Sequence, residues 1–139
     1  MTGPNRASLA KGEVVIERSF PVDRTDLVRY AGAGGDFNPL HWDEATATSA
    51  GLPNVIAHGM FTMALGSCAV ADWLGDPGAI RSYSVRFTRP VVVPADGQAQ
   101  VDIVGTVGEL TEDGARIDLR VTSAGAVVLG KARVVVALG

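Results

Sequence analysis

Cysteine and histidine are scarce in this chain, and their scarcity narrows the chemistry that the sequence can support. Its 139 residues include one cysteine, Cys68, and two histidines, His41 and His58. One cysteine cannot form a disulfide within the chain, and its apolar neighbours predict a buried small side chain rather than a redox centre. The sequence has no Cys-x-x-Cys or His-x-x-x-His pair. We therefore expect no metal, no other cofactor and a reducing, cytoplasmic compartment.

Charge is also sparse, and this argues against two classes of partner. Twelve basic residues stand against fifteen acidic ones, for a net charge of -3, and no basic stripe suited to a phosphate backbone is present. Residues 2–5 do not resemble a secretory signal. The longest apolar stretch, residues 60–74, is interrupted by Gly66 and Asp72 and is shorter than the roughly 20 residues that a membrane span needs. The chain is expected to bind neither nucleic acid nor membrane.

Apolar residues, in contrast, are abundant and make up 47% of the sequence. This is enough for one compact domain with its own core over residues 1–139, and the chain is too short for two such domains. After His58 and Gly59, apolar side chains cover nearly every direction around a helix over residues 60–74. A helix that is apolar all round is typically buried, so this segment predicts a central buried helix.

Alternating apolar and polar residues predict strands on both sides of this helix. Residues 14–16 indicate a first strand that Pro21 closes, and residues 134–138 indicate a final one. Between them the alternation recurs at residues 83–88, 101–103 and 117–121, with turn signals at residues 96–97, 113–114 and 124–125. One buried helix followed by such strands predicts an α+β fold in which an antiparallel sheet curls around the helix.

Two short helices are expected before the long one. Asp23 and Asp26 form a capping-box-like start for a helix through Tyr30, which the glycines at 32, 34 and 35 would end. Asp43 can cap a second short helix, which would stop before residues 51–53. Both helices flank the loop of residues 36–41.

That loop places a carboxylate, Asp36, and an imidazole, His41, five residues apart. Pro39 fixes its own φ and disfavours helical geometry at Asn38, so both side chains can face one cavity. Asn38 can hydrogen-bond to nearby backbone and keep the loop in shape, which is a supporting role. The pattern predicts a paired acid and base, because histidine is the side chain whose ordinary pKa lies nearest neutrality.

The segment Gly35-Asp36-Phe37-Asn38-Pro39-Leu40-His41 resembles the hydratase-2 motif of the MaoC-like (R)-specific enoyl thioester hydratases and dehydratases. The similarity continues into residues 56–60 and 83–88, and so covers most of the chain. Length and the stretch at residues 75–78 most resemble the catalytic subunit of the mycobacterial-type fatty acid synthase II dehydratases. Gly34 departs from the pattern, because many members carry Ser or Thr there.

The resemblance implies a hot-dog fold and a dimer, either a homodimer or a heterodimer with a related hot-dog subunit. It also implies reversible dehydration of (3R)-3-hydroxyacyl thioesters, carried on coenzyme A or acyl carrier protein, to trans-2-enoyl thioesters in fatty acid biosynthesis. His41 would take the C2 proton and Asp36 would assist loss of the C3 hydroxyl. Gly59, at the start of the long helix, would supply the oxyanion hole, and Ser67 would support the catalytic carboxylate.

Several alternatives remain open from the sequence. His58 is more typical of packing or capping than of catalysis, and Arg86 and Arg89 either meet carrier phosphates or form a solvated face. The absence of Gly-x-Ser-x-Gly argues against Ser67 as a hydrolase nucleophile. Alternative functions are an (R)-specific enoyl-CoA hydratase of β-oxidation or polyhydroxyalkanoate supply, an acyl thioesterase on the same fold, and a non-catalytic acyl-binding subunit.

Overall fold

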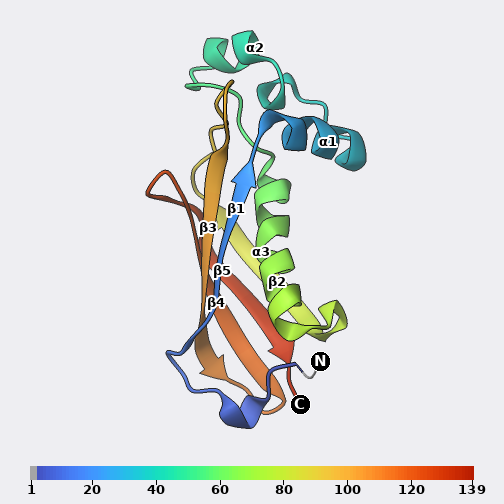
Figure 1. The fold of residues 1–139 in the computed structure, drawn as a ribbon, viewed down its shortest axis with the longest axis vertical. Helices are drawn as coiled ribbons and strands as arrows, with labels where there is room; N and C mark the ends of the chain where they lie inside the picture. The colour runs from blue at the N-terminus through green and yellow to red at the C-terminus, as the bar shows by residue number, and fades with distance from the viewer. Residues whose placement is uncertain (1–2) are drawn as a thin grey trace.

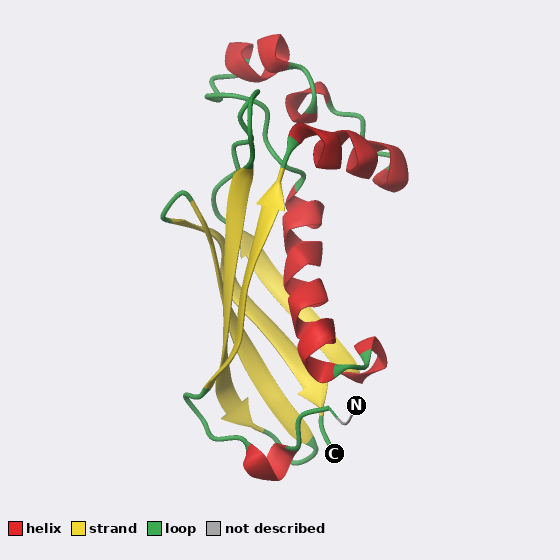
Figure 2. Ribbon diagram, viewed as in Figure 1, coloured by secondary structure: helices red, strands yellow, loops and turns green. Residues whose placement is uncertain are grey.

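A five-stranded antiparallel sheet lies against one long helix in the computed structural model, which describes residues 3–139 (Figures 1 and 2). The strands are β1 (Val14–Val22), β2 (Ile80–Phe87), β3 (Ala99–Leu110), β4 (Gly114–Ser123) and β5 (Ala126–Ala137). Their order across the sheet is β1-β3-β4-β5-β2, and every pairing is antiparallel. Strands β3, β4 and β5 form a meander, whereas β1 and β2 occupy its two edges.

The long helix α3 (Gly59–Leu74) runs along the inner face of this sheet (Figure 1). It ends where Gly75 adopts a left-handed conformation with φ of 73°, which glycine accepts without steric cost. Gly66 lies where the helix approaches β2, and a Cβ there would collide with the Tyr83 hydroxyl. That hydroxyl donates a hydrogen bond to the Met63 carbonyl, at 2.9 Å. The predicted α+β hot-dog arrangement of a sheet around a long helix is confirmed.

The core fills the space between α3 and the three meander strands. Alternate side chains of each strand point toward the helix and are buried, as the period of two requires. These inward residues are Val101, Ile103, Val107, Ile117, Leu119, Val121, Val134 and Val136. The opposite face carries charged and polar residues together with Val104 and Val135, and Arg116 pairs there with Asp118 at 2.9 Å. The turns predicted at residues 113–114 and 124–125 join β3 to β4 and β4 to β5.

Several strand boundaries differ from those that the sequence predicted, among them those of β1 and β5. Strand β1 continues through Pro21 to Val22, with Pro21 opposite Gln100. An edge strand accommodates proline because one side of its backbone has no partner strand, so the missing N–H breaks no ladder. Strand β5 begins at Ala126 rather than Val134. Within β5, Lys131 has φ of 46°. This irregularity interrupts the alternation of apolar and polar residues, so the sequence pattern revealed only the last part of the strand.

The long helix is less buried than its composition predicted. Only the side that faces the sheet is covered, as Thr62 and Val70 show. Met60 is 57% exposed, and Cys68 is also exposed, so the prediction of a buried cysteine is wrong. The reason is geometric, because one sheet covers one side of a helix. Within residues 3–139, no helix has both the length and the apolar character needed to cross a membrane.

Three short helical segments gather at the end of the sheet where α3 begins (Figure 1). They are α1 (Arg24–Gly34), the 3₁₀ turn η2 (Pro39–His41) and α2 (Glu44–Ser49). Asp23 and Asp26 form the predicted capping box of α1, Gly35 ends that helix with φ of 72°, and Asp43 caps α2. Two further 3₁₀ turns, η1 (Arg6–Ser8) and η3 (Pro77–Ala79), lie at the opposite end. Helices α1 and α2 flank the Asp36–His41 loop, which contains η2.

Replacing Ile117 with alanine tests the position of the core. Ile117 is fully buried in β4, so removing its side-chain methyl and methylene groups should lower the free energy of unfolding by about 2–5 kcal/mol. Arg120→Ala on the exposed face of the same strand should change it by no more than about 0.5 kcal/mol. Urea denaturation of both variants measures the difference, and equal losses would place the core elsewhere.

The alkaline stability of the protein should depend on Tyr83. Burial raises the pKa of Tyr83 from its ordinary value of 10.0 to about 12. Between these values the unfolded chain has released the phenolic proton while the folded chain keeps it, so stability falls as pH rises from about 10 to about 12. Denaturation midpoints across that range should fall less steeply in Tyr83→Phe than in the parent. Identical slopes would contradict the assignment.

Candidate active site

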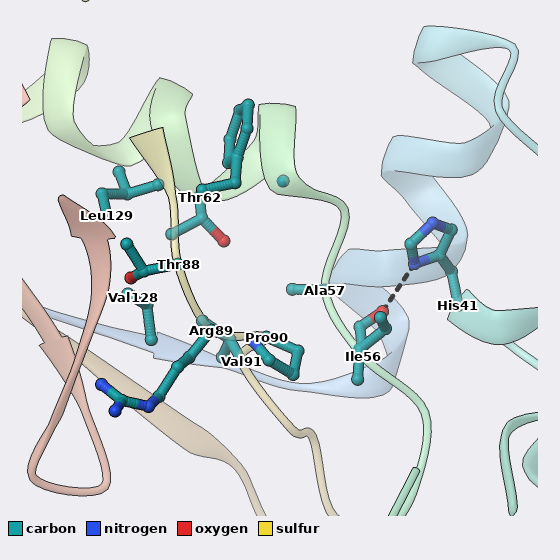
Figure 3. Close-up of a pocket in the computed structure, with 12 residues that line it drawn as sticks. His41, Ile56, Ala57, Thr62, Thr88, Arg89, Pro90, Val91, Val128 and Leu129 are labelled. Atoms are coloured by element: carbon teal, nitrogen blue, oxygen red, sulfur yellow. Dashed lines mark hydrogen bonds between the residues drawn. The ribbon is translucent and has the colours of Figure 1, made fainter. Parts of the chain in front are cut away.

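His41 is held by two backbone contacts between η2 and the chain that leads to α3. Its Nδ1 lies 2.7 Å from the carbonyl oxygen of Ile56 (Figure 3), while the Ile56 N–H donates to the Leu40 carbonyl at 3.1 Å. Because a carbonyl only accepts, Nδ1 carries the hydrogen, and the neutral ring has its lone pair on Nε2. With the residue 9% exposed, this imidazole is a buried base with a defined tautomer.

Asp36 faces that lone pair. One carboxylate oxygen, Oδ2, lies 3.8 Å from Nε2 of His41, and the aspartate side chain is 55% exposed. This separation exceeds a direct hydrogen bond, so the two groups oppose each other without sharing a proton. The other oxygen, Oδ1, accepts from the Asn38 N–H at 3.1 Å, and the Asn38 side chain accepts from the Leu40 N–H at 3.1 Å. Two consecutive turns, each closed by one of these hydrogen bonds, therefore shape the loop between Asp36 and His41.

The Trp42 side chain also bonds to this loop, a contact that was not predicted from the sequence. Its indole Nε1–H donates to the Phe37 carbonyl at 2.9 Å. The available signal was the tryptophan directly after His41, because an indole N–H usually finds an acceptor when the ring packs. The loop is thus held by bonds at both ends, a condition for positioning catalytic groups to within an ångström.

His58 lies between the loop and α3 and is 2% exposed. Its Nε2 is 3.0 Å from the backbone carbonyl oxygen of Asp36. Its ring stacks on that of His41, with centroids 3.7 Å apart and planes 21° apart, and Tyr30 contacts it from another side at 4.8 Å. The side chain makes no capping bond to α3. His58 thus occupies the N-cap position of α3, and its side chain packs in the site without making a capping hydrogen bond.

Gly59 is the first residue of α3, so its backbone N–H has no acceptor within the helix. Gly59 is exposed, and the ring of Phe87 lies beside it, because a Cβ built on Gly59 would lie 3.0 Å from that ring. Ser67 is two turns further along, and its hydroxyl donates to the Ala64 carbonyl at 2.9 Å. The bond from Ser67 to Asp36 that the resemblance implied is not found among residues 3–139.

Two hollows meet at Gly59 and Phe87. One, of about 300 Å³, is mainly apolar, and Figure 3 shows His41 at one side of it and Arg89 at another. The second, of about 270 Å³, is lined by Asp36 and His58. Acid and base thus open into adjoining spaces, both of which touch the first residue of α3.

Asp36, His41 and His58 also place their ligand atoms within 4.8 Å of one another, as a metal site would. The orientation of the rings argues against one. A metal lies in the plane of each imidazole that binds it, and stacked rings only 21° apart have planes that meet far from both. His41 Nδ1 and His58 Nε2 are moreover bonded to carbonyls. The cluster suits proton transfer rather than metal binding.

The chain is similar to known proteins over most of its length. Residues 6–124 match the family described as MaoC like domain. Over 67 residues the chain is 49% identical to 3-hydroxyacyl-thioester dehydratase X of Mycobacterium tuberculosis, covering 48% of this chain and 23% of that protein. The (R)-specific enoyl-CoA hydratase of Rhodospirillum rubrum is 33% identical over 89 residues, which cover 63% of this chain and 62% of that protein.

Solved structures extend the similarity over nearly the whole chain. A MaoC-like dehydratase superposes with a TM-score of 0.94 at 37% identity, over 99% of this chain and 43% of that one. The (R)-hydratase from A. caviae involved in PHA biosynthesis superposes with a TM-score of 0.82 at 29% identity, over 95% and 98%. The chain spans less than a quarter of the mycobacterial relative and less than half of the first structure. Because the family match covers most of its length, this chain belongs to the MaoC-like domain family.

Proposed function

We propose that this protein is a hydro-lyase that reversibly dehydrates (3R)-3-hydroxyacyl thioesters to trans-2-enoyl thioesters, with Asp36 and His41 as its catalytic pair. The observation that carries the proposal is the approach of the Asp36 carboxylate to 3.8 Å from the free Nε2 of His41. Relatives named as a 3-hydroxyacyl-thioester dehydratase and an (R)-specific enoyl-CoA hydratase support the same chemistry.

In the dehydration direction, His41 acts as the base. Its Nε2 lone pair takes the C2 proton, and the electron pair of that C–H bond forms the C2–C3 double bond as the C3–O bond breaks. The bond from Nδ1 to the Ile56 carbonyl persists and stabilises the imidazolium that forms. The acid and base together return one proton to the departing hydroxide, so that water leaves and the pair regains its starting protonation. Hydration reverses these steps.

Gly59 acts on the thioester carbonyl. As the C2 proton leaves, partial negative charge develops on the carbonyl oxygen, and the first N–H groups of α3 offer it hydrogen bonds and the positive end of the helix dipole. The lack of a side chain on Gly59 allows the carbonyl to approach. Asn38 supports the pair through its bond to the loop backbone, and Ser67 is assigned only a structural role on α3.

The acyl carrier is coenzyme A or acyl carrier protein, in a cytoplasmic enzyme of fatty acid biosynthesis that acts as a homodimer or as a heterodimer with a related hot-dog subunit. The alternative is hydration of enoyl-CoA in β-oxidation or polyhydroxyalkanoate supply, which the A. caviae neighbour favours. Both use one reaction in opposite directions. Kinetics on a series of chain lengths, attached to each carrier, would separate them.

Removing either member of the pair should strongly reduce turnover. Asp36→Asn and His41→Ala should each lower kcat/KM for crotonyl-CoA hydration by about 10² to 10⁴, because each removes a positioned acid or base. The loss of enoyl absorbance measures the rate. Asp72→Asn, which changes an exposed carboxylate on α3, serves as the control and should retain parental activity. Parental rates in both pair variants would overturn the mechanism, and release of free thiol would instead indicate a thioesterase.

A proline at position 59 should isolate the contribution of the backbone donor. Gly59→Pro and Gly59→Ala both place a Cβ against Phe87, but only proline removes the N–H. Proline suits the first position of a helix, and His58 already has the extended conformation, φ -60° and ψ 136°, that precedes proline. The proline variant should therefore fold and turn over about 10² to 10³ times more slowly than the alanine variant. Equal rates would exclude this N–H from the oxyanion hole.

A further inference from the structure

We propose that His58 is a positioning residue that holds Asp36 and His41 in their working geometry, an inference that rests on the proposed function. It is bonded to the backbone of one member of the pair and stacked on the ring of the other. It also immediately precedes Gly59, at the start of α3. One buried side chain thus links all three parts of the site.

The first link is the hydrogen bond to Asp36. The Asp36 carbonyl only accepts, so Nε2 of His58 carries the hydrogen and the lone pair is on Nδ1. His41 has the opposite arrangement, because its Nδ1 donates to Ile56. Two backbone carbonyls therefore hold the two stacked imidazoles in opposite tautomers. The bond from His58 holds the backbone carbonyl of Asp36, while the Asp36 carboxylate accepts a hydrogen bond from the Asn38 N–H.

The second link is the stack of rings. Phe61 on α3 contacts Tyr30 on α1 at 5.4 Å, Tyr30 contacts His58 at 4.8 Å, and His58 lies on His41 at 3.7 Å. This row of four rings runs from the long helix to the catalytic base. Because the lone pair of Nε2 lies in the ring plane, the stack that sets this plane also sets the direction in which His41 accepts a proton.

A third feature separates positioning from simple packing. Nδ1 of His58 is buried without a hydrogen-bond partner among the described residues. A buried polar atom left unpaired is unfavourable for stability, and an apolar ring of similar size would not carry it. The Asp36 residue is exposed, so its carbonyl can turn to solvent if His58 is replaced. A histidine at position 58 is therefore better explained by its positioning of Asp36 and His41 than by a contribution to the stability of the fold.

Three variants separate the two links. His58→Phe keeps a ring for the stack but loses the donor, His58→Gln keeps a donor of similar reach but loses the stack, and His58→Leu loses both. We expect His58→Leu to lower kcat for crotonyl-CoA hydration by about 10²-fold with KM changed only slightly, since a displacement of about 1 Å has this effect. The phenylalanine and glutamine variants should fall between it and the parent. His58→Phe should melt no lower than the parent.

The control is Val70→Ala, which removes buried volume from α3 away from the site. It should lower the melting temperature but not kcat. If kcat falls with the melting temperature in Val70→Ala to the same extent as in the His58 variants, or if kcat in the His58 variants equals the parental value, the positioning role is overturned.

Nitrogen-15 spectra of the His41 ring test the proposal without any turnover. The parent should show a single neutral tautomer with the hydrogen on Nδ1, and His58→Leu should show a mixture because the ring is free to turn away from Ile56. An unchanged His41 tautomer in His58→Leu would overturn the positioning role. A parent that hydrates no enoyl thioester would overturn the proposed function, and the spectra would still decide whether His58 orients His41.

Discussion

The packing of α3 against the sheet is the constraint on which the rest of the molecule depends. The absent side chain of Gly66 and the bond from the Tyr83 hydroxyl to the Met63 carbonyl set how closely the helix approaches β2. The position of Gly59, at the first turn of that helix, follows from this contact. The short helices pack around this end of α3 and bring Asp36 and His41 close to the free N–H of Gly59.

Around that point the organisation is carried mainly by backbone groups. The carbonyls of Ile56 and Asp36 each bind one of two stacked imidazoles, and the Phe37 carbonyl binds Trp42. Every residue has a backbone carbonyl, so the sequence does not show which carbonyls bind these rings. This explains why sequence reasoning found the catalytic candidates but not what orients them. It also explains why His58, which has no acid–base task in the proposed mechanism, is buried at the centre of the site.

Short sequence patterns predicted the helices and strands well, but they did not predict what packs against each of them. The capping box at Asp23, the left-handed Gly35 and the cap at Asp43 involve neighbouring residues only, and each was predicted correctly. The errors at Pro21 and Cys68 have a different origin. Whether a proline is tolerated depends on which strand is at the edge, and whether a helix face is covered depends on what lies against it. Neither follows from a short window of sequence.

The sequence by itself determined the loop that carries Asp36 and His41, because its turns are closed by bonds between residues two to five positions apart. It also determined that a long apolar helix would lie against an antiparallel sheet, since periodicity is a local property. Only the tertiary structure decided the tautomer of His41, the stack on His58 and the division of the site into two hollows at Gly59 and Phe87. Those features join residues that lie 15 or more positions apart in sequence. Their meeting is set by how α1, η2, α3 and β2 pack together rather than by local conformational preference.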